Sequence, residues 1–290
     1  MALQRKITLC WPNHAGAAAL SGGGWSANMP LAHLADPAFA VAAESVDADP
    51  ANTQFDLTFP RFLPVGVIAL ASHNLTVDAE WRVRLWRDTA ATDLSWDSGW
   101  MMAWPSVYSS SELEWEYDNF WLGTVDEAQR GDFTALTTHF ADEVQIVRRV
   151  TVEISDTANP DGVIRLGRAF VGDTWQPEYN AAYGIQYGHE IGTEFEVAGN
   201  PEQTEYADVR AAKRTVQFAL EHLSEEEGFR RTLALQRAQG LHGEVLYSEG
   251  GHLDALAFQR TFIGRLSSID PLAHPYFATY SNSISLKEIL

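Results

Sequence analysis

The stretch Thr53–Arg87 decides the fold, and it reads TQFDLTFPRFLPVGVIALASHNLTVDAEWRVRLWR. Residues 54–59 alternate polar and apolar side chains, which is typical of a half-buried strand. Residues 65–71 form a short continuous apolar run, which predicts a strand buried on both faces. Residues 80–86 alternate again, after a polar turn at 72–75. Three strands in this order predict a β-sandwich.

Further motifs flank this stretch. Residues 20–31 read LSGGGWSANMPL, residues 34–36 read LAD, and residues 156–172 read DTANPDGVIRLGRAFVG. Between them come a strand of the form T-x-F-D-L, then H-N-L, then A-x-x-R-V-R. In this order the motifs resemble the galactose-binding-like (discoidin-type) jelly roll of tail and baseplate proteins of tailed bacteriophages. The resemblance covers roughly residues 20–175.

The resemblance implies a mainly-β chain with a galactose-binding-like jelly-roll β-sandwich over residues 20–198. Residues 1–19 are expected to form a strand and an arm. Residues 199–290 change in character and are expected to form a smaller α+β attachment domain. Its helix is predicted to begin at Ser224, because Ser224 and Glu227 have the spacing of a capping box.

The composition is that of a soluble globular protein, with 46% hydrophobic and 20% charged residues. No run approaches the roughly 18 apolar residues of a membrane helix, and no signal peptide is expected, so synthesis is expected in the cytoplasm. Cys10 is the single cysteine, which excludes an intrachain disulfide and a cysteine zinc cage. The net charge of −19 argues against a nucleic-acid partner.

Acids and tryptophans are concentrated in residues 88–143, which contain twelve Asp and Glu residues and a single arginine. Five tryptophans lie there: Trp96, Trp100, Trp104, Trp115 and Trp121. Residues 112–117 alternate acidic and apolar side chains, which predicts a strand with an acidic outer face. The tryptophans are either core residues of a sandwich edge or a recognition surface, where tryptophan is enriched.

No strong catalytic motif is present, so the chain is not expected to be an enzyme, and no cofactor or metal is expected. Glu112, Glu114 and Glu116 have the spacing of a carboxylate set for glycoside hydrolysis, but a solvated strand face explains them more simply. A calcium site at Asp47, Asp49 and Asn52 is equally an ordinary turn. Whether calcium is bound stays open.

Sugar binding needs an exposed aromatic ring beside hydrogen-bonding groups. His73 and Asn74, at a predicted strand end, could supply these groups beside Trp25, Trp100 or Trp104. The same pair has a structural interpretation, because asparagine caps turns. The candidate ligand-binding residues, for a glycan or a partner, are Trp25, His73, Asn74, Trp100, Trp104, Trp115 and Trp121.

We therefore expect a structural component of a phage tail tip or baseplate, a minor tail protein that works by protein–protein assembly. Its expected partners are other tail proteins, in a homo-oligomeric ring or a hetero-assembly, and its expected location is the virion. The alternative function is a carbohydrate-binding module that recognises a host surface glycan.

Overall fold

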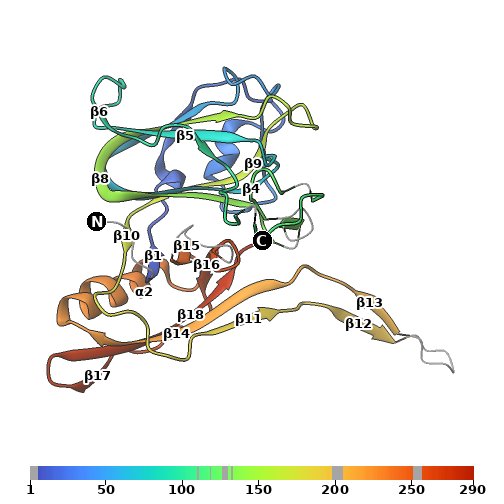
Figure 1. Ribbon diagram of the computed structural model, residues 1–290. Coiled ribbons are helices and arrows are strands. Elements are labelled where there is room, and N and C mark those ends of the chain that lie inside the picture. The colour runs from blue at the N-terminus through green and yellow to red at the C-terminus, as the bar shows by residue number, and fades with distance from the viewer. Residues whose placement is uncertain are drawn as a thin grey trace. The chain divides into compact units, whose positions relative to one another are not determined.

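The computed structural model describes residues 6–109, 111–117, 119–125, 130–131, 133–197, 205–250 and 257–290 (Figure 1). The chain forms two compact units. Unit 1 comprises Met1–Pro177, Glu244–Ile263 and Leu290, and unit 2 comprises Glu178–Gly243 and Gly264–Ile289. The expected boundaries lie at 19/20 and 198/199; here the first segment of unit 1 ends at Pro177, and residues 244–263 also belong to unit 1.

The regular elements of unit 1 are mostly strands. They are β1 (Ile7–Cys10), β2 (Ala19–Ser21), β3 (Ala43–Glu44), β4 (Phe55–His73), β5 (Glu80–Trp86), β6 (Leu94–Asp97), β7 (Met101–Met102), β8 (Leu136–Ser155), β9 (Arg165–Gly172), β10 (Thr174–Trp175) and β15 (Val245–Glu249). Two short 3₁₀ helices, η1 (Ala15–Ala17) and η2 (Leu31–Ala35), precede β3. β16 (Thr261–Leu266) begins in unit 1 and ends in unit 2.

One antiparallel sheet, in the order β3-β9-β4-β8-β5-β6, folds into the two layers of a sandwich. β4 and β8 are long enough to belong to both layers, and Figure 1 shows β8 curving from one layer to the other. Their register shifts twice at the curve, between Thr58 and Leu63 and between Val65 and Val67. Such bulges let a paired strand bend without losing its ladder.

The core lies between these layers and follows the predicted alternation. Phe55, Leu57 and Phe59 of β4 are buried, as are Trp81 and Val83 of β5. The second half of β4 is buried on both faces, as its apolar run predicts. A Cβ at Gly66 would lie 2.4 Å from Thr174 Oγ1, so glycine is needed where β10 packs on β4. The mainly-β, antiparallel fold class is confirmed.

A buried ion pair ties residue 244 to the sandwich. Arg168 of β9 donates from Nη2 to Glu244 Oε2 at 2.9 Å, and both side chains are buried. Asn13 donates to the same Oε2 at 2.6 Å and to the Ala169 carbonyl, while Arg168 Nη1 donates to the Leu34 carbonyl. Four segments that are distant in sequence are therefore joined around one ion pair.

Removing one partner of this pair is expected to destabilise unit 1 strongly. Arg168→Leu leaves Glu244 buried without its cation, a change that typically costs about 3–5 kcal/mol. The double variant Arg168→Leu/Glu244→Leu is expected to lose less than the sum of the two single variants. Urea unfolding of the four proteins measures this, and additive losses would contradict the coupling.

Unit 2 contains a twisted antiparallel sheet and one helical segment. Its elements are β11 (Gln186–Glu190), β12 (Glu194–Val197), β13 (Glu205–Asp208), β14 (Lys213–Leu223), the π-helix η3 (Glu227–Thr232), α2 (Leu233–Gln239), β17 (Ala273–Tyr276) and β18 (Thr279–Glu288). β14 pairs with β18 and β11, and Val216, Phe218 and Ile284 point to its buried face. A buried Arg214–Glu288 pair joins its two long strands.

The predicted capping box is confirmed. Ser224 Oγ and its backbone N–H both donate to Glu227 Oε2, and the Glu227 N–H donates back to Ser224 Oγ at 3.3 Å. The helical segment ends at Gly240, whose φ of 52° suits glycine. Within the described residues no helix is both long and apolar enough to span a bilayer.

One sequence prediction is wrong. Residues 112–117 form turns rather than a strand, because Glu112 accepts bonds from the Ser109 backbone and hydroxyl. Val144 and Ile146 of β8 are exposed whereas Val150 and Val152 are buried, because the register with β4 shifts between Val147 and Arg149. The boundary expected at 198/199 separates two paired strands, β12 and β13; residues 198–204 lie outside the described residues.

Candidate functional site

His73, at the end of β4, is held by structural hydrogen bonds. Its Nδ1 accepts the Leu75 N–H at 3.3 Å, which places the ring proton on Nε2, 3.0 Å from Thr137 Oγ1. Thr137 in turn donates to the Ala103 carbonyl at 2.8 Å. Burial lowers the pKa of His73 from 6.5 to about 3, so the ring is neutral at pH 7. His73 has no polar atom left for a ligand.

Asn74 is likewise committed to the fold. Its side-chain amide donates to the Val163 carbonyl at 2.9 Å and to Asp161 at 3.0 Å. Its side-chain oxygen accepts the Arg165 N–H at 2.8 Å. Asn74 therefore ties the end of β4 to the start of β9, which matches its structural interpretation.

Two of the candidate tryptophans pack inside unit 1. Trp104 lies edge-on to His73 with ring centroids 5.4 Å apart, and its Nε1 donates to the Leu75 carbonyl at 3.0 Å. Trp25 packs edge-on against Phe55 at 5.9 Å. Of the candidate set, the structure thus brings together His73, Asn74 and Trp104, and their polar contacts are internal.

The other three candidate tryptophans are on the surface. Trp100 is half exposed beside β7, while Trp115 and Trp121 are largely exposed on the loop after it, Trp121 at 78%. Tyr117 is exposed on the same loop, as are the carboxylates of Glu114 and Glu116. We call the exposed rings of Trp115, Tyr117 and Trp121 the aromatic loop. It has the side chains, though not a pocket, of a recognition surface.

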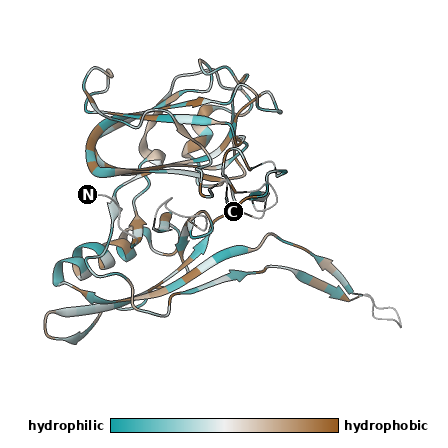
Figure 2. Ribbon diagram, viewed as in Figure 1, coloured by the Kyte–Doolittle hydropathy of each residue, from teal (hydrophilic) through white to brown (hydrophobic). Residues whose placement is uncertain are grey.

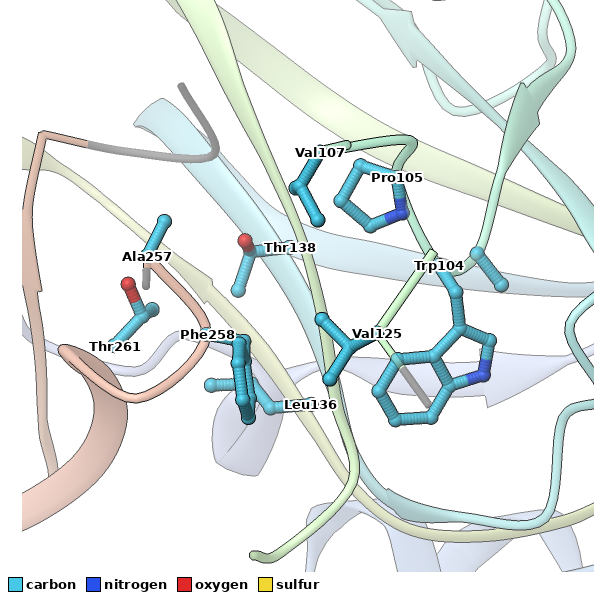
Figure 3. A pocket seen from close by; sticks show the side chains of 10 residues that line it. Trp104, Pro105, Val107, Val125, Leu136, Thr138, Ala257, Phe258 and Thr261 are labelled. Atoms are coloured by element: carbon cyan, nitrogen blue, oxygen red, sulfur yellow. The ribbon is translucent and has the colours of Figure 1, made fainter. Parts of the chain in front are cut away.

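Two hollows of unit 1 lie near these residues. The first is apolar, bordered by Trp104, Val125, Leu136 and Phe258 (Figure 3). Its volume of about 50 Å³ is below the roughly 150 Å³ that accommodates a benzene ring, so a sugar does not fit. The second is an open hollow of about 510 Å³ beside His73 and Arg165, whose guanidinium already pairs with Glu44 at 2.6 Å.

The carboxylate and calcium sites considered from the sequence are not assembled among the described residues. Glu112 serves as a turn acceptor, and hydrogen bonds from Ser109 lower its pKa. Asp47 accepts the Asn52 amide and the Asp49 N–H, which makes the candidate calcium segment an ordinary turn. Among residues the structure describes, no group of three or more His, Cys, Asp or Glu could hold a metal. Cys10 is buried, and burial raises the pKa of its thiol.

An exposed apolar surface on β12 and β13 was not predicted, although residues 183–198 were expected to form a hairpin-rich extension. β12 and β13, which we call the ribbon, pair only with each other among the described strands. Figure 1 shows the ribbon continuing β11 and β14 away from α2, and Figure 2 shows apolar residues along it. A two-stranded ribbon is marginally stable alone in water.

The register gives the ribbon two different faces. Residues directly opposite each other share a face, and successive residues alternate. Phe195 opposite Ala207 and Val197 opposite Glu205 form one face, on which Phe195 is 65% and Val197 57% exposed. The other face carries Glu194, Glu196, Tyr206 and Asp208. The ribbon is therefore amphipathic, with its apolar face uncovered.

Comparison with known proteins gives weak structural likenesses only. No protein-family model and no curated protein matches the sequence. SpGH29 is similar over 57% of this chain and 28% of its own, at 15% identity and a TM-score of 0.37. A Streptococcus pneumoniae fucose binding module is similar over 56% of this chain and 94% of its own, at 11% identity and a TM-score of 0.34. A fucolectin from striped bass (Morone saxatilis) serum is similar over 95% of this chain and 92% of its own, at 11% identity and a TM-score of 0.36.

The TM-scores of these three solved structures all lie below 0.4. The first of them is much longer than the matched region, which spans about a quarter of its length. Identities of 11 to 15% say nothing about the ligands or partners of this chain.

His73 gives a prediction on acid stability. The neutral ring is favoured in the folded state, so this contribution is complete above about pH 6.5 and is lost as the pH falls toward about 3. His73→Gln is expected to be less stable at pH 7 but to lose stability less steeply between pH 6.5 and 4. Urea unfolding at pH 7, 5.5 and 4.5 measures how the free energy of unfolding changes with pH in the wild type and in the variant. The same pH dependence of stability in both proteins would contradict the conclusion that His73 is buried in its neutral form.

Proposed function

We propose that this chain is a structural subunit that works by protein–protein assembly through the ribbon. The assembly is the tail tip or baseplate of a tailed bacteriophage, the setting that the sequence resemblance implies, and the working location is the virion. The observation that carries the proposal is the uncovered apolar face of Phe195 and Val197 on a ribbon with no third strand among the described residues.

Physical reasons favour a protein partner for this face. Burying a Phe or Val side chain is worth about 1.5–3 kcal/mol, so leaving two of them in water on a marginal hairpin is unfavourable. Ribbon edges with unpaired backbone groups also pair readily with other chains. The acidic opposite face and the net charge of −19 keep the free subunit soluble before assembly.

The ribbon face can be tested by co-expression with the products of the neighbouring genes. Phe195→Ser/Val197→Ser is expected to lose co-purification of a partner that the wild-type chain retains. Leu241→Ser, at another exposed apolar residue of unit 2, is the matched control and is expected to retain it. Loss in the control, or retention in the ribbon variant, would contradict the assignment.

The aromatic loop supports a second candidate function, the recognition of a host glycan. Exposed Trp115 and Trp121 offer ring faces for stacking on a sugar, and the exposed carboxylates of Glu114 and Glu116 can accept hydrogen bonds from hydroxyls. The hydrogen bonds within unit 1 leave His73 and Asn74 out of this candidate site.

A glycan screen of the purified chain tests this second function. A cognate sugar is expected to protect the tryptophan fluorescence from quenching, and Trp115→Ala/Trp121→Ala is expected to reduce binding at least tenfold. Trp100→Ala, a half-exposed tryptophan outside the loop, serves as the control. The absence of any sugar response would exclude glycan recognition and leave the assembly proposal standing.

A further inference from the structure

The aromatic loop lies in a stretch of the chain that has no basic residue. Between Arg87 and Arg130 the sequence contains nine Asp and Glu residues and no Lys or Arg. Arg87 pairs with Asp93 at 3.5 Å. Arg130 donates to the Val125 carbonyl at 2.8 Å, and its guanidinium lies 5.6 Å from the centre of the Trp104 ring. The two arginines at the ends of this stretch therefore already have partners inside unit 1.

Most of the described carboxylates in this stretch are used by the fold, and two are not. Hydrogen bonds or ion pairs with neighbouring residues occupy the side chains of Asp88, Asp93, Asp97 and Glu112. Glu114 and Glu116 are exposed, and neither carboxylate forms an ion pair or a hydrogen bond with any residue that the structure describes. These two carboxylates flank Trp115, whose side chain is 69% exposed.

Backbone hydrogen bonds close this loop at its base and at its exposed turn. The N–H groups of residues 107–108 both donate to the Gly123 carbonyl at 2.9 Å. The Tyr117 N–H donates to the Glu114 carbonyl at 3.1 Å, which closes a turn around Trp115. The exposed ring and its flanking carboxylates are thus presented on a hydrogen-bonded turn, and such preorganisation reduces the entropy lost when a partner binds.

The outer face of the sandwich contains an example of what a ring beside a carboxylate binds. The Arg84 guanidinium lies 5.5 Å from the centre of the Trp86 ring and at the same time pairs with Glu153 at 2.7 Å. Arginine suits both contacts, because its planar guanidinium stacks on an aromatic face while its N–H groups donate to a carboxylate. Trp115 has the ring and two carboxylates of this arrangement, but no arginine among the described residues lies over it.

We infer that the aromatic loop binds arginine side chains on a short segment of a different protein. An arginine of that segment stacks on Trp115 and donates to Glu114 or Glu116, as Arg84 does with its ring and its carboxylate. The inference rests on the proposed assembly function and adds to the ribbon a second contact of different chemistry. A glycan and a second copy of this chain are the other occupants, and the experiment below separates them.

Size and charge favour this partner over the others. The three rings of the aromatic loop are 57% to 78% exposed, and at about 150–250 Å² per aromatic side chain they offer roughly 400 Å². A stable interface between folded proteins buries about 800 Å² on each side, so the loop fits a short segment better than a folded face. A neutral glycan would gain nothing from the local negative charge, and a second copy, also of net charge −19, would be repelled.

Two peptides that differ only in their cation test the inference. One alternates glycine with arginine and the other alternates glycine with lysine, at equal length and charge. Fluorescence anisotropy measures the binding of each labelled peptide to the intact chain. The arginine peptide is expected to bind at least fivefold more tightly, because a guanidinium stacks on a ring and donates in parallel to a carboxylate, whereas an ammonium is a compact point charge.

Variants of the loop are compared with a matched variant elsewhere. Trp115→Leu keeps an apolar side chain but removes the aromatic ring, and Glu114→Gln/Glu116→Gln removes two charges. Each is expected to weaken binding of the arginine peptide at least tenfold. Glu221→Gln/Glu225→Gln removes two exposed acids of unit 2 and is expected to change the affinity less than twofold. All five positions are exposed, and unchanged urea midpoints confirm that the variants fold.

The other outcomes overturn the inference and are distinguishable from one another. Equal binding of both peptides, with equal losses in the loop and matched variants, would show attraction to the net negative charge alone. A neutral glycan that protects the tryptophans, without binding of the arginine peptide, would assign the loop to glycan recognition. Self-association that Trp115→Leu abolishes would place a second copy on the loop. A chain that binds neither peptide, yet retains a co-expressed partner through the ribbon, would leave the assembly function intact.

Discussion

The buried ion pair between Arg168 and Glu244 determines how the chain is divided. Glu244 is far from β9 in sequence, yet its carboxylate accepts hydrogen bonds from Arg168 and Asn13 inside unit 1. A buried carboxylate is tolerated only when it is paired and hydrogen-bonded. This pairing fixes the start of β15 in unit 1. Residues 178–243 therefore lie, in sequence, between two segments of unit 1.

The sequence predicted those features that depend on residues close together in the chain, namely the strands of the sandwich and the start of the helix. The alternation of residues 54–59 and 80–86 gave the strands of the sandwich and their buried faces. The Ser224–Glu227 spacing gave the helix start, because both groups lie within one turn. The Arg168–Glu244 pair could not be predicted, because nothing in the sequence near either residue identifies the other.

The errors have related causes. Residues 143–154 alternate, but Val144 and Ile146 are exposed because the register with β4 shifts between Val147 and Arg149. Alternation in residues 112–117 predicted a strand, but the bonds from Ser109 to Glu112 close a turn. The candidate site combined exposed side chains with side chains that are hydrogen-bonded inside the fold. The sequence shows that His73 and Asn74 are polar, but it does not show that their hydrogen bonds are made within unit 1. A hairpin-rich extension over residues 183–198 was predicted, but the two faces of the ribbon were not, because their register depends on the partner strand beyond the expected boundary.

Polar groups are mostly satisfied within each unit, and apolar groups are left uncovered at defined places. His73, Asn74 and Trp104 stabilise the end of β4. The ribbon and the aromatic loop expose large side chains on otherwise well-packed units. This distribution favours a protein whose work is done at its surfaces, by contact with other macromolecules.

Hydrogen–deuterium exchange of the ribbon amides tests this account most directly. The measurement compares dilute protein with concentrated protein and with protein co-expressed with its neighbouring gene products, following residues 194–197 and 205–208, with β14 as the internal reference. The account predicts fast exchange of the ribbon in dilute protein and at least tenfold slower exchange in associated preparations, with β14 unchanged. Equal ribbon exchange in all three preparations would contradict the claim that this surface is the working interface.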